Sequence, residues 1–311
     1  MGFLTEAVPP RHAALGVLPG ITRIVANNPG VMTYHGTNTY LVDHDDGLVV
    51  LDPGPEDDTH IADILAAAAK PITLILLTHT HADHAGAVPG LKAATGAPVA
   101  GFETPAKPGF TPEIALADGG QIRGFTAVHT PGHAADHLCF AYTGAAGEKI
   151  LFSGDHVMSW SSSIVSPPEG DMVEYYRSLQ RLLSRDDDVF LPGHGPLLRE
   201  PRTLTAQLLA HRQRRERSLM TELARQDWSV AGLAAKLYGK QDLFLKAAAQ
   251  RNVLAHLLKL KAEGAVKEMA PDTAEHPDNL ALAAMAEQSE SWRSRVLRMQ
   301  GDAKRRFGLA A

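Results

Sequence analysis

Short apolar runs separated by turn residues fill the first 200 residues of the chain. Two such runs, at 38–42 and 47–51, flank a turn of Asp and His residues and predict a β-hairpin. Apolar positions at a spacing of three and four predict a helix over 59–70, and the uninterrupted apolar run at 72–77 predicts a buried strand. Strands interrupted by helices in this way predict a mixed α/β domain over residues 1–200.

The same patterns continue up to residue 200. They predict further strands at 99–101, 124–129, 137–142, 149–153 and 189–191, and an amphipathic helix at 172–183. Most of the histidine and aspartate clusters in this part follow directly on a predicted strand. Because loops at strand ends are held by a rigid sheet, we expect a functional site there.

The pattern changes after residue 200. Leu-, Ala- and Arg-rich stretches predict helices at 203–226, 230–238 and 243–261, followed by a strand-like segment at 265–269. This order of helices and strands is typical of a winged helix, so residues 201–270 are predicted to form a helical winged-helix-like domain. Residues 271–311, rich in Ala, Glu and Arg, are predicted to be a helical or partly ordered tail.

Charge is unevenly placed along the 311 residues, whose formal net charge is −5. Residues 1–200 contain 11 Lys/Arg against 23 Asp/Glu, whereas residues 201–311 contain 19 against 12. Such asymmetry fits two domains with different tasks. The basic part fits a role in polyanion binding and ordinary solvated helix faces equally well.

Cys139 is the only cysteine, so no intramolecular disulfide can form. It falls within a predicted strand, and we expect it to be a buried apolar residue rather than a nucleophile. The first residues lack the basic start and apolar core of a secretory signal, and no run of 18 apolar residues occurs. We therefore expect a cytoplasmic protein without a membrane span.

Four metal-binding side chains stand within six residues, directly after the predicted strand at 72–77. They are His79, His81, Asp83 and His84. In a tight loop, His79 and His81 can share one metal while Asp83 and His84 serve a second, and imidazole and carboxylate both suit Zn²⁺. One loop cannot fill two coordination spheres. Further ligand-type residues follow other predicted strands, namely His133, Asp155 and His194, and each stands beside a glycine.

These motifs resemble the metallo-β-lactamase superfamily over about residues 20–200, and the fold implied is its αββα sandwich. The resemblance implies that His79, His81 and His133 bind a first metal and that Asp83, His84 and His194 bind a second, with Asp155 between them. The cofactor implied is two Zn²⁺, although the same ligands accept Fe or Mn. The blocks at 28–30, 36–42 and 251–264 are similar to one branch, which has a C-terminal winged helix and includes the mitochondrial β-lactamase-like endoribonuclease.

The resemblance implies a hydrolase in which two metals lower the pKa of a bridging water and produce a hydroxide nucleophile. In this scheme Asp83 orients the nucleophile and relays a proton to the leaving group, and His137 donates a hydrogen bond to the developing oxyanion. Asp136 is a candidate for fixing a histidine tautomer. His35 and Asn38, which the branch places near the site, are candidates for contacting the substrate, and Trp160 is a candidate pocket wall.

Two functions remain open at this point. The favoured one is attack on an ester, thioester, lactone or amide carbonyl of a small-molecule or acyl substrate. The alternative is a single-strand-specific endoribonuclease that binds RNA, which the basic C-terminal part and the Arg-rich run at 212–217 support. A homodimer formed through the winged-helix region is a further expectation left open, because such domains often serve only in packing.

Overall fold

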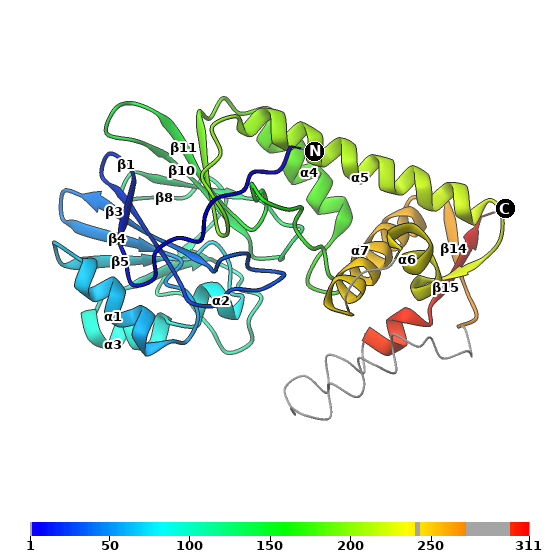
Figure 1. Cartoon of the computed structure of the whole chain (residues 1–311), viewed down its shortest axis with the longest axis horizontal. Coiled ribbons are helices and arrows are strands. Elements are labelled where there is room, and N and C mark those ends of the chain that lie inside the picture. The colour runs from blue at the N-terminus through cyan, green and yellow to red at the C-terminus, as the bar shows by residue number, and fades with distance from the viewer. Residues whose placement is uncertain (1, 240–242, 272–298, 311) are drawn as a thin grey trace. The chain divides into compact units, whose positions relative to one another are not determined.

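The computed structural model describes residues 2–239, 243–271 and 299–310, and in it the chain forms two compact units (Figure 1). Unit 1 comprises Met1–Ser163 and Glu174–Leu208, and unit 2 comprises Ile164–Val173 and Leu209–Ala311. The predicted boundary at residue 200 lies close to the end of unit 1. Nothing in the residue pattern indicated that residues 164–173 would group with the C-terminal residues.

Unit 1 contains two β-sheets. The first sheet has seven strands in the order β1 (Leu15–Leu18), β2 (Ile21–Val25), β3 (Asn38–His44), β4 (Gly47–Leu51), β5 (Ile72–Leu76), β6 (Val99–Phe102) and β7 (Ile114–Leu116). The second has five strands in the order β12 (Val189–Pro192), β11 (Lys149–Gly154), β10 (Leu138–Thr143), β9 (Phe125–His129) and β8 (Gln121–Ile122). Strands β4 to β7 are parallel, and so are β11 and β12.

Alternate residues of the first sheet pack on opposite sides of it. In β4, Val49 and Leu51 belong to the core shared with the second sheet, whereas Leu48 and Val50 belong to a second core. That second core includes Ile64 of α1 (Asp58–Ala67) together with residues of α3 (Val88–Thr95), so these helices cover the outer face (Figure 1). Burial of both strand faces explains why the runs are apolar without interruption.

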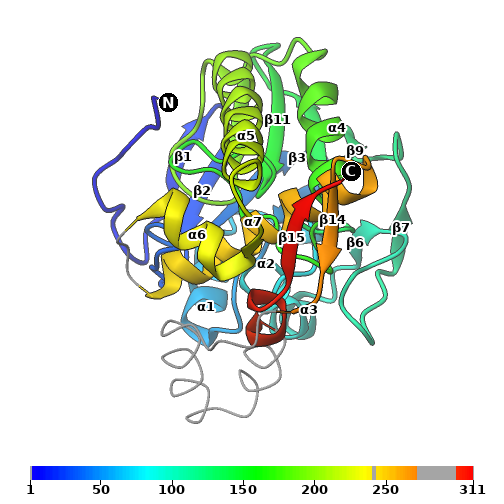
Figure 2. The same cartoon turned by 90° about the vertical axis from the view of Figure 1, so that its right-hand side faces the viewer.

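The helix α4 (Met172–Leu183) lies beside the second sheet in both views (Figures 1 and 2). Within unit 1 it buries Tyr175, Leu179 and Leu182. Ser178 of α4 donates to the carbonyl of Pro131, in the loop after β9. Helices therefore flank both sheets, which confirms the predicted αββα architecture.

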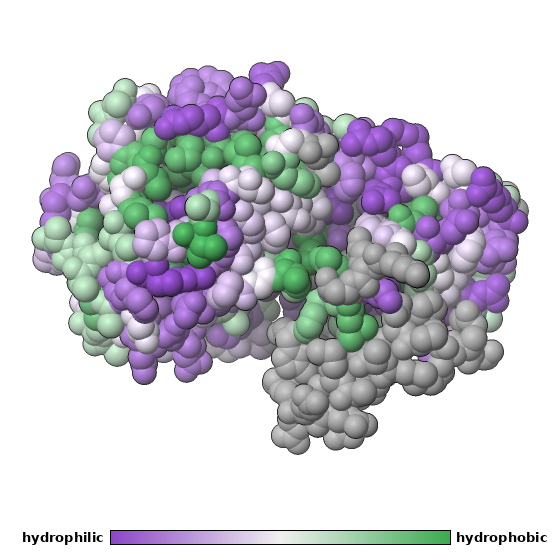
Figure 3. Space-filling model, in the orientation of Figure 1, coloured by the Kyte–Doolittle hydropathy of each residue, from purple (hydrophilic) through white to green (hydrophobic). Residues whose placement is uncertain are grey.

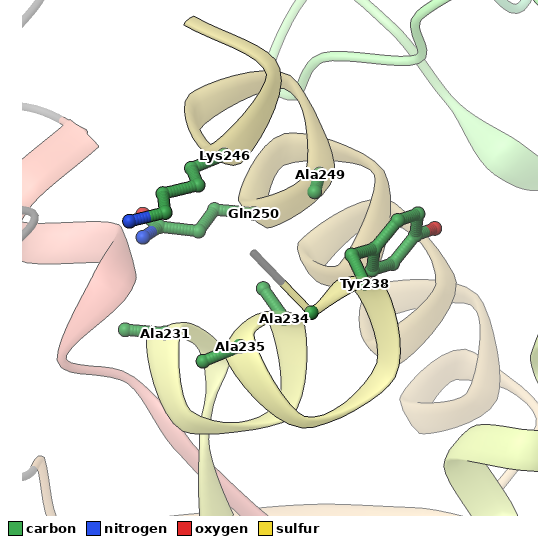
Figure 4. A pocket seen from close by; sticks show the side chains of 8 residues that line it. Ala231, Ala234, Ala235, Tyr238, Lys246, Ala249 and Gln250 are labelled. Carbon is green, nitrogen blue, oxygen red and sulfur yellow. The ribbon is translucent and has the colours of Figure 1, made fainter. Parts of the chain in front are cut away.

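Unit 2 contains the end of α5 (Pro201–Leu223), α6 (Val230–Tyr238), α7 (Leu243–Ala262) and a small antiparallel sheet. Ser229 caps α6 by accepting a hydrogen bond from the backbone of Gly232. The crevice between α6 and α7 is lined mainly by small residues, including Ala231, Ala234 and Ala249, which lets the two helices approach closely (Figure 4). The helix and sheet arrangement confirms the predicted winged-helix-like fold.

The central strand of this small sheet comes from the predicted tail. The sheet order is β13 (Trp228–Ser229), β15 (Arg306–Leu309) and β14 (Val266–Met269), and Phe307 is fully buried. The prediction of a helical or partly ordered tail therefore missed a strand, because four residues are too few to show a clear alternation. Most of the tail, residues 272–298, lies outside the described residues.

Large hydrophobic side chains that are exposed in the described part of unit 1 are Leu4, Val8, Val31, Met32 and Leu65. Val31 and Met32 are adjacent, and the face seen in Figure 3 carries both hydrophobic and hydrophilic areas. Among the described helices, none combines the length and the apolar character that crossing a membrane requires.

Candidate metal centre

All seven predicted ligands lie at or just beyond the ends of strands. His79, His81, Asp83 and His84 follow β5 and lead into the short helix α2 (Ala82–Ala85). His133 follows β9, Asp155 follows β11 and His194 follows β12. Because β4 and β5 are parallel, as are β11 and β12, their ends open on common edges of the two sheets. The structure brings these residues together in two neighbouring clusters.

The first cluster consists of three imidazoles. The Nδ1 atom of His81 lies 2.9 Å from Nε2 of His79 and 3.0 Å from Nε2 of His133. Burial and the neighbouring His84 and His81 lower the pKa of His79 well below its usual value. Neutral imidazoles whose nitrogens converge on one point are suited to a divalent cation.

The second cluster contains two imidazoles and two carboxylates. Nε2 of His84 lies 3.5 Å from an oxygen of Asp83 and 3.4 Å from Oδ1 of Asp155. Nε2 of His194 lies 3.3 Å from Asp83 and 3.4 Å from Oδ2 of Asp155. The same Oδ2 lies 3.6 Å from Nε2 of His133 in the first cluster. The Asp155 carboxylate therefore borders both clusters.

Three buried atoms of the second cluster fit a metal ion better than they fit a closed hydrogen-bond network. Nε2 of His84, Nε2 of His194 and Oδ1 of Asp155 make no hydrogen bond within the described parts of the chain. These atoms meet oppositely charged groups only at 3.3–3.5 Å, which is longer than an ordinary hydrogen bond, so the set is poorly satisfied unless a cation binds. Imidazole nitrogen with carboxylate oxygen suits Zn²⁺, Fe and Mn alike.

A glycine makes room for this cluster. A Cβ atom at Gly193 would lie 2.5 Å from Oδ1 of Asp155 and 2.7 Å from Cε1 of His84. No larger residue at this position could keep both ligands where they are. The glycine beside the predicted ligand His194 is thus required by close approach.

The charges within the second cluster shift each other's protonation. Burial opposes a charge on His194, but the carboxylates of Asp155 and Asp83 raise its pKa to about 9. Burial likewise opposes a charge on His84, and Asp155, Asp83 and Asp52 outweigh it and raise the pKa well above the usual value. For Asp155, His194 and His84 overcome the effect of burial and lower its pKa well below the usual range. Without a metal, His84 and His194 are therefore protonated at neutral pH. A cation that binds their nitrogen atoms has to displace these protons.

Asp52 supports the second cluster and was not among the predicted site residues. It is fully buried, accepts hydrogen bonds from the backbone and hydroxyl of Thr78 at 2.8 and 2.7 Å, and lies 2.9 Å from Nδ1 of His84. It thereby ties the end of β4 to the end of β5 and orients the His84 ring. Its place directly after an apolar strand is the signal that could have identified it.

Asp136 holds the His79–His81 loop, but not through a histidine. Its Oδ2 accepts hydrogen bonds from the backbone and hydroxyl of Thr80, at 3.2 and 2.6 Å, and from the backbone of Ala106 at 2.9 Å. Since Thr80 stands between His79 and His81, Asp136 fixes the backbone that carries both ligands. The expected contact with a histidine ring is replaced by this contact with Thr80.

His137 lies behind the ligands and is fully buried. Its Nε2 accepts a hydrogen bond from the backbone N–H of Asp155 at 3.1 Å, and its Nδ1 lies 2.9 Å from the Thr130 hydroxyl. Burial lowers the pKa of His137 well below its usual value, so the ring is neutral. A nitrogen that accepts a backbone N–H has no proton to donate, so this geometry does not support the predicted oxyanion donor. It supports a role in positioning Asp155.

Asn38, predicted to lie near the site, holds the loop that carries His194. Its side-chain amide donates to the carbonyls of Pro192 and Gly195, at 2.9 and 2.8 Å. Nδ1 of His194 lies 3.2 Å from the carbonyl of Gly36. Asn38 is itself buried, so its side chain supports the site from behind rather than facing a substrate.

Cys139 is buried, as predicted, with its thiol 3.2 Å from the Thr130 hydroxyl. Burial raises the pKa of the thiol to about 12. A thiol in this state is not a nucleophile at neutral pH.

Comparison with protein families identifies the chain's two parts. The profile of the Metallo-beta-lactamase superfamily matches residues 32–113 and 100–194, and that of the Beta-lactamase associated winged helix domain matches residues 229–272. The second match lies within unit 2 and the first ends at His194.

Individual proteins extend this result. A "Beta-lactamase-like protein 2 homolog" of Drosophila melanogaster is 29% identical over 81% of this chain and 94% of its own length. An "Atrochrysone carboxyl ACP thioesterase" of Aspergillus chevalieri is 31% identical over 70% of each chain. A crystal structure of a beta-lactamase domain protein from Burkholderia ambifaria is 21% identical, covers 98% of this chain and 96% of its own, and has a TM-score of 0.74, which shows a shared fold.

Proposed function

Because this chain belongs to the metallo-β-lactamase superfamily, a group of hydrolases, we propose that it is a binuclear metal-dependent hydrolase of acyl substrates. The bond cleaved would be an ester, thioester, lactone or amide. The observation that carries the proposal is the Asp155 carboxylate, with one oxygen 3.4 Å from His84 and the other 3.4 Å from His194 and 3.6 Å from His133. A carboxylate with both oxygens turned to different imidazoles is suited to joining two cations.

The ligand sets follow from the two clusters. His79, His81 and His133 would hold the first ion, Asp83, His84 and His194 would hold the second, and Asp155 would contact both. We propose two Zn²⁺, with Fe or Mn accepted by the same donors. When bound, such a pair lowers the pKa of a water between the ions and polarises the scissile carbonyl.

Asp83 is the residue best suited to handle the proton. Its side chain is 30% exposed, whereas that of Asp155 is 9% exposed, so Asp83 is the more accessible carboxylate of the site. The neighbouring His84 and His194 outweigh the effect of burial and lower its pKa, which keeps it ionised. An ionised, accessible carboxylate can accept a hydrogen bond from the attacking water and pass its proton to the leaving group. We therefore retain Asp83 as the catalytic acid–base group and propose His137 as a positioning residue.

An aromatic surface beside His194 supports an acyl substrate. The rings of Tyr34 and Trp160 stack with their centroids 4.9 Å apart. The Trp160 ring lies so close to Gly195 that a Cβ atom there would be 2.7 Å from it. Trp160 thus contacts the residue next to the proposed ligand His194, and we propose that its flat ring binds the acyl group. Thioesters are the first class to test, because one relative is named as a thioesterase.

The RNA alternative receives less support from unit 2. Two arginines of the 212–217 run are engaged within the unit: Arg212 is buried and donates to Asn252, and Arg215 donates to the carbonyl of Leu237 and stacks over the Tyr238 ring. The helix α7 is buried at nine successive positions, Ala249–Leu257, so this stretch offers no free face to a nucleic acid groove. Single-stranded RNA is therefore the competitor in the substrate test rather than the proposed substrate.

The proposal is tested by metal analysis and a substrate panel on wild type and on Asp155→Ala. Wild type is expected to contain about two metal equivalents per chain and to hydrolyse a thioester, ester or lactone. Asp155→Ala should lose most of the metal and the activity, whereas Asp45→Ala, an exposed carboxylate on the β3–β4 turn, should change neither. A wild-type chain that binds no metal would refute the proposal, and cleavage of RNA alone would replace the substrate class.

A further inference from the structure

The residue that orients the proposed ligand His84 has an unfavourable backbone conformation. Asp52, which follows β4, has a φ of 51°, in the left-handed region that residues with a Cβ atom rarely adopt. Such a conformation persists only where the surrounding contacts hold it. The Asp52 N–H donates to the carbonyl of Leu76, on β5, at 2.9 Å, and its carbonyl accepts a hydrogen bond from the hydroxyl of Thr39, on β3, at 2.7 Å. The backbone of Asp52 is thus held from both strands that flank β4.

The Thr39 hydroxyl is itself held by a histidine that is not part of the metal centre. Nε2 of His60, on α1, lies 2.9 Å from Oγ1 of Thr39. Since the Thr39 hydroxyl gives its proton to the Asp52 carbonyl, His60 has to be the donor and its Nε2 carries a proton. His60 is 2% exposed and Thr39 is fully buried, so solvent has little access to this hydrogen bond. Burial lowers the pKa of His60, which keeps the ring neutral with its single proton on Nε2.

His60 also packs against the other end of the segment that begins with Asp52. A Cβ atom at Gly54 would lie 2.8 Å from Cδ2 of His60 and 2.9 Å from its Nε2. The φ of Gly54 is 93°, so both its conformation and this close approach require glycine. The Gly54 N–H donates to the carbonyl of His84 at 3.1 Å. The ring of His60 therefore lies directly against a residue whose backbone holds the proposed ligand His84.

We infer that His60 is a positioning residue for the second metal cluster and acts through residues 52–54, all within unit 1. This segment contacts His84 twice, through the Asp52 carboxylate at Nδ1 of the ring and through the Gly54 N–H at the backbone. The contact at Nδ1 leaves Nε2 of His84 as the atom that faces the other proposed ligands. Without the His60 ring, the hydroxyl that holds the Asp52 carbonyl loses its donor, and Gly54 loses the packing that fixes it. The inference rests on the proposed function in one respect, that His84 is a ligand.

The zinc content of the full chain, measured after dialysis against a chelator, tests the inference. His60→Ala should weaken zinc binding at the second cluster about 10-fold, the lower end of the loss that follows when the support of a ligand is removed. It should therefore retain about one of two zinc equivalents under conditions in which wild type retains both. Ile64→Ala is the matched control, because Ile64 is fully buried one turn further along the same helix and belongs to the hydrophobic core outside the first sheet. It should lower the melting temperature at least as much as His60→Ala does and leave both zinc equivalents bound.

Variants of Thr39 separate the hydrogen bond from the packing of the ring. Thr39→Val removes the hydroxyl but keeps the branched shape, and it should weaken zinc binding in the same way as His60→Ala. Thr39→Ser keeps the hydroxyl and should bind zinc nearly as wild type does. Because His60→Ala and Thr39→Val act on one path, their combination should weaken zinc binding by less than the product of the two separate effects.

His81→Ala, which removes a proposed ligand of the first cluster, identifies the site affected. The zinc equivalent that this variant retains should be released when His60→Ala is added. Retention of that equivalent, or wild-type zinc affinity in either His60→Ala or Thr39→Val, would overturn the inference, and so would equal zinc loss in Ile64→Ala or Thr39→Ser. Where His60→Ala does not fold, Thr39→Val and Thr39→Ser decide the outcome. A wild-type chain without zinc would instead refute the proposed function.

Discussion

Asp136 offers a graded test of how the first cluster is built, because one carboxylate oxygen holds Thr80 between His79 and His81. Asp136→Ala leaves the backbone N–H of Thr80, a residue only 8% exposed, without an acceptor, at about 1–3 kcal/mol. It also removes the hydrogen bond that the Thr80 hydroxyl donates to the carboxylate, which costs about 1.5–3 kcal/mol. The free energy of unfolding should therefore fall by about 2.5–6 kcal/mol, which lowers the melting temperature by at least about 5 °C.

The same change should release metal selectively. Both ligands beside Thr80 belong to the first cluster, so Asp136→Ala is expected to lose about one of two metal equivalents on dialysis while the second is retained. Asp136→Asn keeps an oxygen where Thr80 needs it, and its metal content and melting temperature should lie between those of Asp136→Ala and wild type. Asp118→Ala is the control, since that exposed carboxylate accepts the backbone N–H of His129 at 2.8 Å but contacts no proposed ligand. Loss of both metals together, or equal behaviour of the Asn and Ala variants, would refute this reasoning.

Three further predictions concern other parts of the site. Because the pKa of His194 is raised to about 9 without metal, zinc uptake at pH 7–8 should release protons, which calorimetry in buffers of different ionisation enthalpy detects. Zinc uptake without proton release would contradict this assignment. The same raised pKa means that protonated His194 stabilises the metal-free fold fully below about pH 6.5, and that this stabilisation is lost as pH rises through about 9. Gly193→Ala should lower activity about 100-fold by displacing Asp155 and His84, whereas Gly16→Ala, where a Cβ meets nothing within 4 Å, should not. Cys139, with its pKa raised to about 12, should resist iodoacetamide at pH 8 until the chain is unfolded, and labelling of the native protein would contradict its burial.

Much of the fold could be predicted because most elements have long or regular patterns. The predicted helix at 172–183 coincides with α4, and that at 230–238 with α6. The strand β15 could not be predicted in the same way, since Arg306–Leu309 is too short to show alternation and pairs with strands far away in the sequence. Local patterns carry no information about such partners.

The residues of the candidate site also fall into those that the sequence predicts and those that it does not. His79, Asp83 and the other proposed ligands could be found because metal-binding residue types follow apolar strands at short spacing. The supporting residues could not be assigned, because their roles depend on which atom they meet. A sequence does not tell that Nε2 of His137 accepts the N–H of Asp155, or that Asp52 lies 2.9 Å from the far nitrogen of His84. Both are residues of the same types as the ligands, at comparable positions.

The segment 164–173 shows how contacts distant in the sequence decide to which unit a segment belongs. Predicted from the sequence, the catalytic domain would contain this segment and the winged-helix domain would begin later. In the structure the backbone of Val165 and the hydroxyl of Ser166 find their partners in Asn252 and Arg251. A chain that lacked α7 would leave the N–H of Val165 without this acceptor. These contacts join positions 87 and 85 residues apart in the sequence, and local residue patterns do not reveal such partners.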